Sequence, residues 1–170
     1  GSFLEEKAKH YFKQLTDAVC YLHELDIAHR DLKCENVFLM WNNQIKLGDF
    51  GFARSCVDCS GKKVLSDTFC GSAAYAAPEI LKGISYDPKM YDMWALGCIL
   101  YIMITASMPF DDTDVRKMIK TQLNGSIFTS LFLWTEHSMA LKQLLNSLLE
   151  PDLNRRITIK GVKSHQWFQQ

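Results

Sequence analysis

Apolar residues recur at helical spacing over the first 25 positions of the chain. Between Leu4 and Leu25 they fall three or four residues apart, with charged residues between them, as on the buried face of an amphipathic helix. The same reading predicts four further helices, over residues 89–105, 113–123, 138–149 and 159–164. Pro109 and Pro151 lie where a helix could not continue.

Two short apolar runs and a long irregular stretch lie between the first two helices. Residues 37–40 and 45–47 are typical of short strands joined by a polar turn at 41–44. Residues 49–79 are mostly irregular, and connections of that length are usually either disordered or functional. No internal repeat, low-complexity tract or linker divides the sequence. We therefore predict one helix-rich unit, mainly α with a few short β-strands (α+β).

The composition disfavours some classes of partner. The chain has 170 residues, a one-domain length, with 19 basic and 19 acidic residues and a formal net charge of zero. This balance does not favour a general nucleic-acid binder or a protein held on an anionic membrane. The longest apolar run, residues 93–104, is shorter than the roughly 20 residues of a membrane span. We interpret it as a buried helix.

The cysteines indicate a reducing compartment. Six of them are scattered without a repeated spacing, and we find no signal peptide, so we expect free thiols in an intracellular, cytoplasmic protein. Cys56 and Cys59 could be half of a zinc site, but no second pair of Cys or His stands at a matching distance. Structural zinc needs four ligands. We interpret these two residues as loop cysteines.

The sequence HRDLKCEN, residues 29–36, contains candidate chemistry. Phosphoryl transfer to a hydroxyl needs a carboxylate that accepts the hydroxyl proton, a cation on the transferred phosphate and ligands for Mg²⁺. Asp31, Lys33 and Asn36 match these roles in that order. Asp49 would be a second metal ligand, since Mg²⁺ favours a few hard oxygen ligands. A His-Arg-Asp triplet alone is more often a surface loop, so the prediction depends on several motifs occurring together.

Three motifs together resemble those of the eukaryotic protein kinases. HRDLKCEN, Asp-Phe-Gly at 49–51 and Ala-Pro-Glu at 77–79 have the order and spacing of the catalytic loop, the metal-binding loop and the closing motif. The lysine after HRDL is the serine/threonine-kinase form. The resemblance implies ATP and Mg²⁺ as cofactors and transfer of the γ-phosphate to Ser or Thr hydroxyls of protein substrates.

The resemblance also implies residues with scaffold roles. Asp92, inside an apolar helix, is similar to the aspartate that holds the catalytic-loop backbone, and Arg156 to the arginine that pairs with the glutamate of the closing motif. The full set with such roles is His29, Phe50, Gly51, Glu79, Asp92 and Arg156. Phe38, with Ile99 and Met103, is expected beneath the adenine ring. Simple core packing is the alternative for these three.

The segment before Ala-Pro-Glu resembles a phosphorylation switch. Thr68 occupies the position of the usual activating phosphosite, and Arg30 and Arg54 are the cations expected to receive its phosphate. The alternative for Thr68 is an ordinary loop threonine. An upstream kinase is the corresponding partner.

Five residues are expected to shape the substrate groove. Ser72 should bond near the catalytic aspartate and lysine, and an apolar pocket should take the residue that follows the acceptor hydroxyl. Most kinases have proline where this chain has Ala73, and basophilic relatives carry an acid where it has Ile102, so strong basophilic preference is not supported. The groove residues are Glu35, Phe69, Ser72, Ala73 and Ala76.

Connecting sequences extend the resemblance to a subfamily. Residues 68–79, 83–88 and 107–112 are most similar to the testis-specific serine/threonine kinases, which implies a role in male germ-cell differentiation. We find no G-x-G-x-x-G motif, so residues 1–170 resemble a partial kinase domain, the carboxyl-terminal lobe without the amino-terminal lobe. Its expected parts are a catalytic loop at 29–36, an activation segment at 49–79 and a helical subdomain at 89–170.

A lobe without its partner would behave differently from a complete kinase. We expect little or no turnover from these residues alone, because phosphate positioning and water exclusion would be lost. Exposed Phe38 and Phe50 should favour self-association. A truncated or pseudokinase-like binding module, without activity of its own, is the alternative function.

Overall fold

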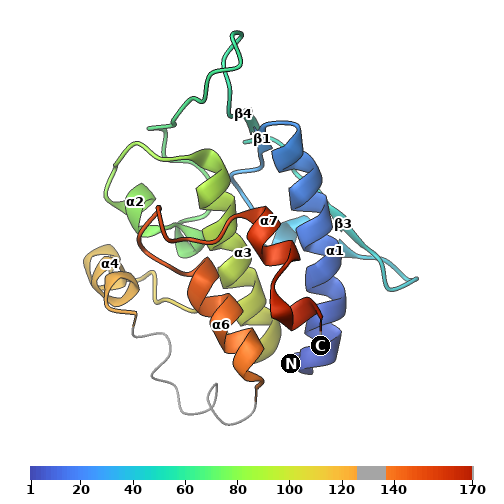
Figure 1. Ribbon diagram of the computed structural model, residues 1–170. Helices are drawn as coiled ribbons and strands as arrows, with labels where there is room; N and C mark the ends of the chain where they lie inside the picture. The colour runs from blue at the N-terminus through green and yellow to red at the C-terminus, as the bar shows by residue number, and fades with distance from the viewer. Residues whose placement is uncertain (126–136, 170) are drawn as a thin grey trace.

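A computed structural model describes residues 1–125 and 137–169 of the chain. It is mixed, with helices predominating and four short strands in two separate pairs (Figure 1). The elements in chain order are α1 (Glu5–Glu24), β1 (Ile27–Ala28), η1 (Cys34–Asn36), β2 (Val37–Leu39), β3 (Ile45–Leu47), β4 (Arg54–Ser55), η2 (Ala73–Tyr75), α2 (Pro78–Leu81), α3 (Pro88–Thr105), α4 (Val115–Leu123), α6 (Met139–Leu148), α7 (Ile159–Lys163) and η4 (Gln166–Phe168).

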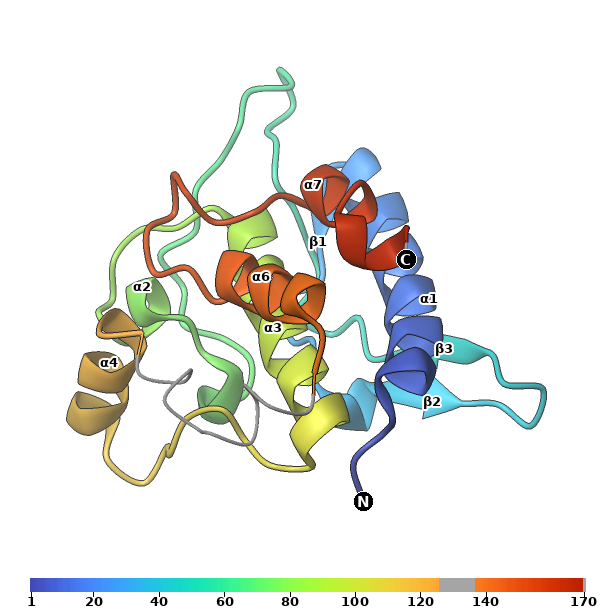
Figure 2. The ribbon, with the colours of Figure 1, turned by 60° about the horizontal axis from the view of Figure 1, so that its bottom comes forward.

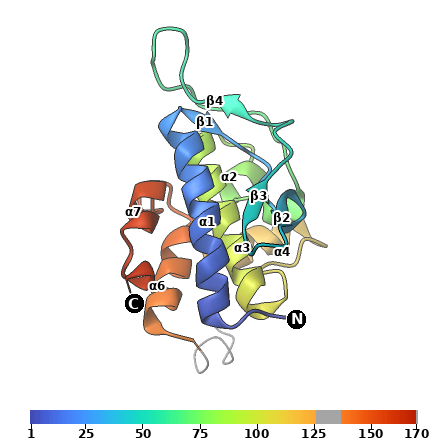
Figure 3. The same cartoon turned by 90° about the vertical axis from the view of Figure 1, so that its right-hand side faces the viewer.

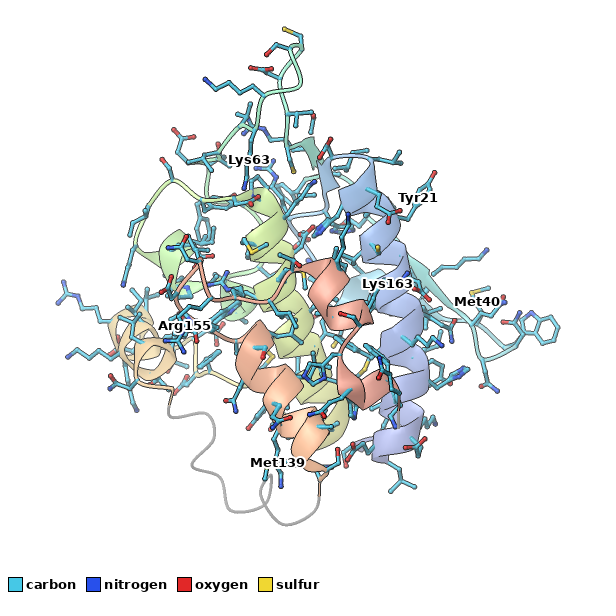
Figure 4. The ribbon with its side chains drawn as sticks, viewed as in Figure 1. Tyr21, Met40, Lys63, Met139, Arg155 and Lys163 are labelled. Atoms are coloured by element: carbon cyan, nitrogen blue, oxygen red, sulfur yellow. The ribbon has the colours of Figure 1, made fainter. Side chains whose placement is uncertain are left out.

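Helix α3 forms the centre of the core. Residues on all of its faces are buried, Trp94, Leu96, Ile99 and Leu100 completely, as expected for a helix that is apolar all round. Helices α1 and α6 pack against α3, and α7 packs against α1 (Figures 1 and 3). Lys163 of α7, labelled in Figure 4, forms an ion pair with Asp17 of α1 at 2.9 Å.

Side-chain caps fix where the predicted helices begin. The side chain of Asp87 accepts a hydrogen bond from the Lys89 amide at the start of α3, and Asp114 caps α4 in the same way. Ser138 accepts from the amide of Leu141 at the start of α6. These acceptors satisfy amides that have no partner inside the helix. The predicted helices are confirmed, with ends displaced by at most two residues.

The two predicted strands form an antiparallel hairpin. Val37 pairs with Leu47 and Leu39 with Ile45, while Asn43 takes a positive φ of 60° in the turn. The hairpin projects from the molecule beside α1 (Figures 1 and 2), and Met40 marks its outer part in Figure 4. The prediction of strands over 37–40 and 45–47 is confirmed to within one residue.

Some elements were not predicted. Strands β1 and β4, of two residues each, pair antiparallel and join Ala28 to Arg54, so the end of the first helix meets the 49–79 segment. Helix α2 begins at Pro78, and apart from β4, η2 and the start of α2 residues 49–79 are irregular, as predicted. Proline is favoured in the first turn of a helix because the amide it lacks would have no partner there.

Other sequence expectations concern absences. None of the helices in the described ranges is both long enough and apolar enough to cross a bilayer. All six cysteines lie in the described ranges, and none forms a disulfide. Residues 1–125 and 137–169 contain no group of three or more His, Cys, Asp or Glu side chains that could hold a metal ion. Cys56 is buried and Cys59 is exposed.

Candidate active site

The backbone of residues 29–36 is fixed from helix α3. The Asp92 carboxylate, fully buried, accepts hydrogen bonds from the amides of His29 and Arg30, each at 2.8 Å, and from Nε2 of His23 at 2.9 Å. A buried carboxylate is costly without such donors. Arg30 has a positive φ of 64°, uncommon for a residue with a side chain, so the Asp92 contact holds a backbone conformation that is otherwise unfavourable.

Asp31, Lys33 and Ser72 form one polar cluster. Lys33 Nζ lies 2.9 Å from Asp31 Oδ2 and donates to Ser72 Oγ at 3.1 Å. The Ser72 amide donates to Asp31 Oδ1 at 3.1 Å. The hydrogen bond with Asp31 raises the pKa of Lys33, burial opposes this rise, and the negative charges of Glu35 and Asp49 add to it. Lys33 is therefore a cation at neutral pH, next to a buried carboxylate.

Asn36 lies against Asp31. Its Nδ2 donates to the carbonyl of Asp31 at 2.9 Å and to Asp31 Oδ2 at 3.3 Å. Within the described residues its Oδ1 receives no hydrogen bond, so this oxygen is available to a cation. The carbonyl of Asn36 accepts from the amide of Gly48 at 2.9 Å, and this contact joins the loop to the residue before Asp49.

The oxygens of these residues suit a hard cation. Asp31 and Asp49 supply carboxylates, Asn36 supplies an amide oxygen, and no sulfur or imidazole is among them. Mg²⁺ prefers such donors and normally completes its shell with substrate oxygens and water. The residues present therefore fit Mg²⁺ in their chemistry.

The residues around Asp49 are packed against the 29–36 loop. Nε2 of His29 lies 3.0 Å from the carbonyl of Gly48, and the rings of His29 and Phe50 are 5.0 Å apart. Asp49 has a positive φ of 57°, and its Oδ1 accepts from the Gly51 amide at 3.3 Å. A Cβ at Gly51 would lie only 3.2 Å from that oxygen, a close approach that favours glycine.

Arg30 and Arg54 meet at Ser66, not at Thr68. Nη1 of Arg30 donates to Ser66 Oγ at 3.2 Å, and Nη1 of Arg54 donates to the same oxygen at 3.4 Å. Ser66 is 1% exposed, and its backbone pairs in both directions with Tyr86. The Thr68 side chain is exposed and makes no hydrogen bond within the described residues, while its carbonyl accepts from the Tyr86 hydroxyl at 2.9 Å.

The expected groove residues are not all on one surface. Phe69 and Ala73 are exposed, whereas Ala76 is fully buried. Glu35 accepts from the Tyr75 hydroxyl at 3.5 Å. Phe69, Ala73 and Ala76 therefore do not present their side chains to a ligand together in this structure.

The three residues expected beneath the adenine ring do not line one cavity. Ile99 and Met103 line a cavity of about 320 Å³ together with Val37 and Leu39 of β2. Phe38 does not line it. Its side chain is 53% exposed and lies against Gly48, because successive residues of a strand point to opposite faces. Phe38 therefore does not share a cavity with Ile99 and Met103 in this structure, and its exposure rules out the alternative of core packing for Phe38. Its place beneath an adenine ring stays a prediction.

Glu79 and Arg156 form a bidentate pair under the end of the 49–79 segment. Nη1 and Nη2 of Arg156 lie 2.6 and 2.9 Å from the two carboxylate oxygens of Glu79, and both side chains are buried. The guanidinium also covers the Trp94 ring at 5.0 Å and donates to the carbonyls of Met90 and Glu150. Several partners thus compensate the burial of both charges.

Gln122 of α4 was not among the predicted site residues. Its Nε2 donates to the carbonyl of Ala76 at 2.9 Å, and the side chain is 1% exposed. A signal existed in the sequence, since Gln122 lies one helical turn after the buried Met118 on a face that otherwise faces the core.

Comparison with known proteins gives consistent results. The family described as protein kinase domain matches residues 1–168. Testis-specific serine/threonine-protein kinase 2 of Mus musculus is 51% identical over 172 aligned residues, covering 99% of this chain and 47% of the mouse protein. Testis-specific serine/threonine-protein kinase 3 of Homo sapiens is 48% identical, covering 99% of this chain and 60% of the relative.

A plant protein is more distant. CBL-interacting protein kinase 17 of Oryza sativa subsp. japonica is 38% identical over 169 residues, covering 99% of this chain and 36% of its own length. The chain spans about half the length of the first of the testis-specific relatives named above.

Proposed function

Because this chain belongs to the protein kinase family, we propose that it carries the acceptor-binding part of a serine/threonine kinase, which transfers the γ-phosphate of ATP to Ser or Thr hydroxyls of protein substrates. We assign residues 1–170 to the carboxyl-terminal lobe. Residues 29–36 are then the catalytic loop, 49–79 the activation segment and 89–170 the helical subdomain. An amino-terminal lobe, to cover the phosphates, is its required partner.

The cluster of Asp31, Lys33 and Ser72 supports this proposal most directly. Asp31, held by the Ser72 amide and by Lys33, would orient the acceptor hydroxyl and accept its proton. Lys33 would lie on the oxygens of the transferred phosphoryl group, where its charge opposes the negative charge of the phosphate. Each role uses a group that the fold already holds in position, so little reorganisation is needed during the reaction.

The metal would be held by Asn36 and Asp49. When bound, Mg²⁺ neutralises charge on the nucleotide phosphates. The contacts of Asn36 support its part, because its Nδ2 is engaged by Asp31 and its Oδ1 is left for a cation. Asp49 follows Gly48, whose amide is bonded to Asn36. ATP and Mg²⁺ are therefore the proposed cofactors.

The names of the relatives support a cellular setting. Two of them are called testis-specific serine/threonine kinases, so we place this protein in male germ-cell differentiation and expect an upstream kinase as activator. The unpaired cysteines agree with a reducing, intracellular compartment. Thr68 is the proposed activating phosphosite.

The substitution Asp31→Asn tests the proposed reaction. In a full-length form of the protein, it should lower phosphate transfer to Ser/Thr peptides by about 10²–10⁴-fold, the usual contribution of a general base. Transfer is measured with radiolabelled ATP, and folding by circular dichroism. Asp67→Asn, which makes the same change at an exposed carboxylate of the activation segment, is the control.

Two results would contradict the proposal. Equal transfer by Asp31→Asn and the unchanged protein would remove Asp31 from the reaction. A folded, full-length protein that binds partners but transfers no phosphate with ATP and Mg²⁺ would favour the alternative of a pseudokinase-like binding module.

A further inference from the structure

Within residues 1–125 and 137–169, three residues of the turn at 72–76 are hydrogen-bonded to the rest of the molecule. At its start, the Ser72 amide donates to Asp31. In its middle, the Tyr75 hydroxyl accepts from the Cys34 amide at 3.3 Å. At its end, the Ala76 carbonyl accepts from Nε2 of Gln122 at 2.9 Å. The first two attachments come from the 29–36 loop, and the third comes from helix α4.

Gln122 is an unusual residue for its position. Its side chain is buried, and within residues 1–125 and 137–169 its Oε1 has no hydrogen-bond partner. An unpaired amide oxygen inside a protein is unfavourable, so an apolar residue of similar length would serve packing alone at least as well. The feature that such a residue could not supply is the hydrogen bond to Ala76.

The backbone geometry of the turn would accept proline at position 73, but the chain has alanine there. Ser72 has φ −87° and ψ 125°, the extended conformation required of a residue before proline. Ala73 is the first residue of η2, and its amide donates no hydrogen bond within the described residues. Proline at 73 would therefore cost no hydrogen bond and would fix φ. With alanine there, the turn depends more on its outside attachments.

Of these three attachments, the one from helix α4 is the one that does not come from the 29–36 loop. Figures 1 and 2 show α4 beside α2, the helix that directly follows the turn, and the two helices pack together. The position of α4 thus determines where the Ala76 carbonyl is held.

We propose that Gln122 is a positioning residue for the protein substrate: by bonding Ala76 it holds the turn 72–76 in the conformation that receives the residues around the acceptor hydroxyl. Gln122 touches no reacting atom and acts through Ala76. The proposal rests on the proposed kinase function and adds a residue of α4 to its substrate groove. The alanine at position 73 makes this attachment necessary.

The test is a cycle of two substitutions in a full-length form of the protein. Gln122→Met keeps the length of the side chain but removes the hydrogen bond. It should raise the KM for a peptide substrate about fivefold, the factor that corresponds to one net hydrogen bond. The KM for ATP, kcat and the melting temperature should stay nearly unchanged. Adding Ala73→Pro should return the peptide KM to within about twofold of the starting value, because proline limits the freedom of the turn.

The matched control is Asn124→Met, which introduces the same residue at an exposed position of the same helix end. It should change neither KM. Peptide affinity is also measured by fluorescence polarisation without ATP, which reports on the groove even if turnover is slow. If Gln122→Met does not fold, Gln122→Asn takes its place. Its amide is too short to reach Ala76, so it should change the two KM values in the same way.

The outcomes separate this inference from the function on which it rests. Absence of transfer by the unchanged full-length protein counts against the kinase proposal. Normal transfer, together with an unchanged peptide KM for folded Gln122→Met, overturns the inference alone. A raised peptide KM that Ala73→Pro does not restore overturns it too, because the defect would then arise outside the turn.

Discussion

Two neighbouring hydroxyls of the 49–79 segment have different surroundings, and their substitutions should have different effects. Ser66 is buried between Arg30 and Arg54, while Thr68 is exposed with its carbonyl held by Tyr86. Arg30 also donates from Nε to the carbonyl of Phe52 at 2.8 Å. The Ser66 hydroxyl is therefore the acceptor that the two guanidinium groups share before any phosphate is added.

Ser66→Ala should loosen the segment. Removal of the hydroxyl takes away the acceptor that the two Nη1 atoms share, while Arg30 Nε keeps its bond to the Phe52 carbonyl. A hydrogen bond to a charged group contributes enough for an increase in local opening of about tenfold. Limited chymotrypsin cleavage after Phe69, which is 55% exposed, measures this opening. Ser85→Ala, at an exposed serine near Tyr86, is the control. Equal cleavage rates in the two variants would show that the Ser66 hydroxyl does not hold the segment.

Thr68→Ala should affect activity and leave the segment's order unchanged. The Thr68 side chain makes no hydrogen bond within the described residues, so its loss costs no contact in the unphosphorylated protein. A phosphate on Thr68 would add charge for Arg30 and Arg54 to bind. In a full-length form, peptide phosphorylation after treatment with an activating kinase should fall strongly, with chymotrypsin cleavage unchanged. Undiminished turnover would remove Thr68 from the proposed switch.

The identities of these residues could be predicted from the sequence, but their partners could not. By resemblance, the motifs place Arg30, Arg54 and Thr68 in one functional group. Ser66 and Thr68, however, lie at nearly the same distance from the two arginines along the chain. Only the Ser66–Tyr86 backbone pairing, which joins residues 20 positions apart, turns Ser66 inward. Gln122 was missed for the same reason, because its partner Ala76 lies 46 residues away.

Among the helices and strands, those with capping residues and long periodic patterns were predicted best. Asp87, Asp114 and Ser138 cap the helices that they precede, and each is a residue type with that preference. Strands β1 and β4 contain two residues each, too few for an alternating pattern. Strand β2 has three residues, too few to tell from an alternating pattern which face meets the core, so the sequence did not separate exposed Phe38 from Val37 and Leu39, which line the cavity.

Asp92→Asn should weaken the attachment of the 29–36 loop to α3. The carboxylate accepts from two amides and His23, and an asparagine amide would turn a donor toward one of these donors. We expect the free energy of unfolding to fall by about 3 kcal/mol. Urea unfolding measures the change, with Asp112→Asn, at an exposed carboxylate, as control. The same unfolding midpoint in both variants would contradict a structural role for Asp92.

The side of the molecule that carries the hairpin and the Asp-Phe-Gly turn exposes large apolar side chains. Phe38 and Phe50 are 53% and 49% exposed, and they come from the hairpin and from the Asp-Phe-Gly turn, which the Asn36–Gly48 hydrogen bond joins. Phe52, directly after the Asp-Phe-Gly turn, is also exposed. In a complete kinase, the amino-terminal lobe would cover this side by the proposed domain assignment. The chain by itself should therefore associate through it.

Analytical ultracentrifugation of residues 1–170 over a wide concentration range measures this association. The double variant Phe38→Gln/Phe50→Gln should be monomeric at concentrations where the unchanged chain associates, since about 25 cal/mol is lost per Å² of apolar surface no longer buried between copies. Trp41→Gln is the matched control: Trp41 is 93% exposed but lies in the turn of the hairpin. Association that Trp41→Gln abolishes and the double variant leaves intact would place the contact at the hairpin turn, and a monomer at all concentrations would show that the apolar side is too small to hold two copies together.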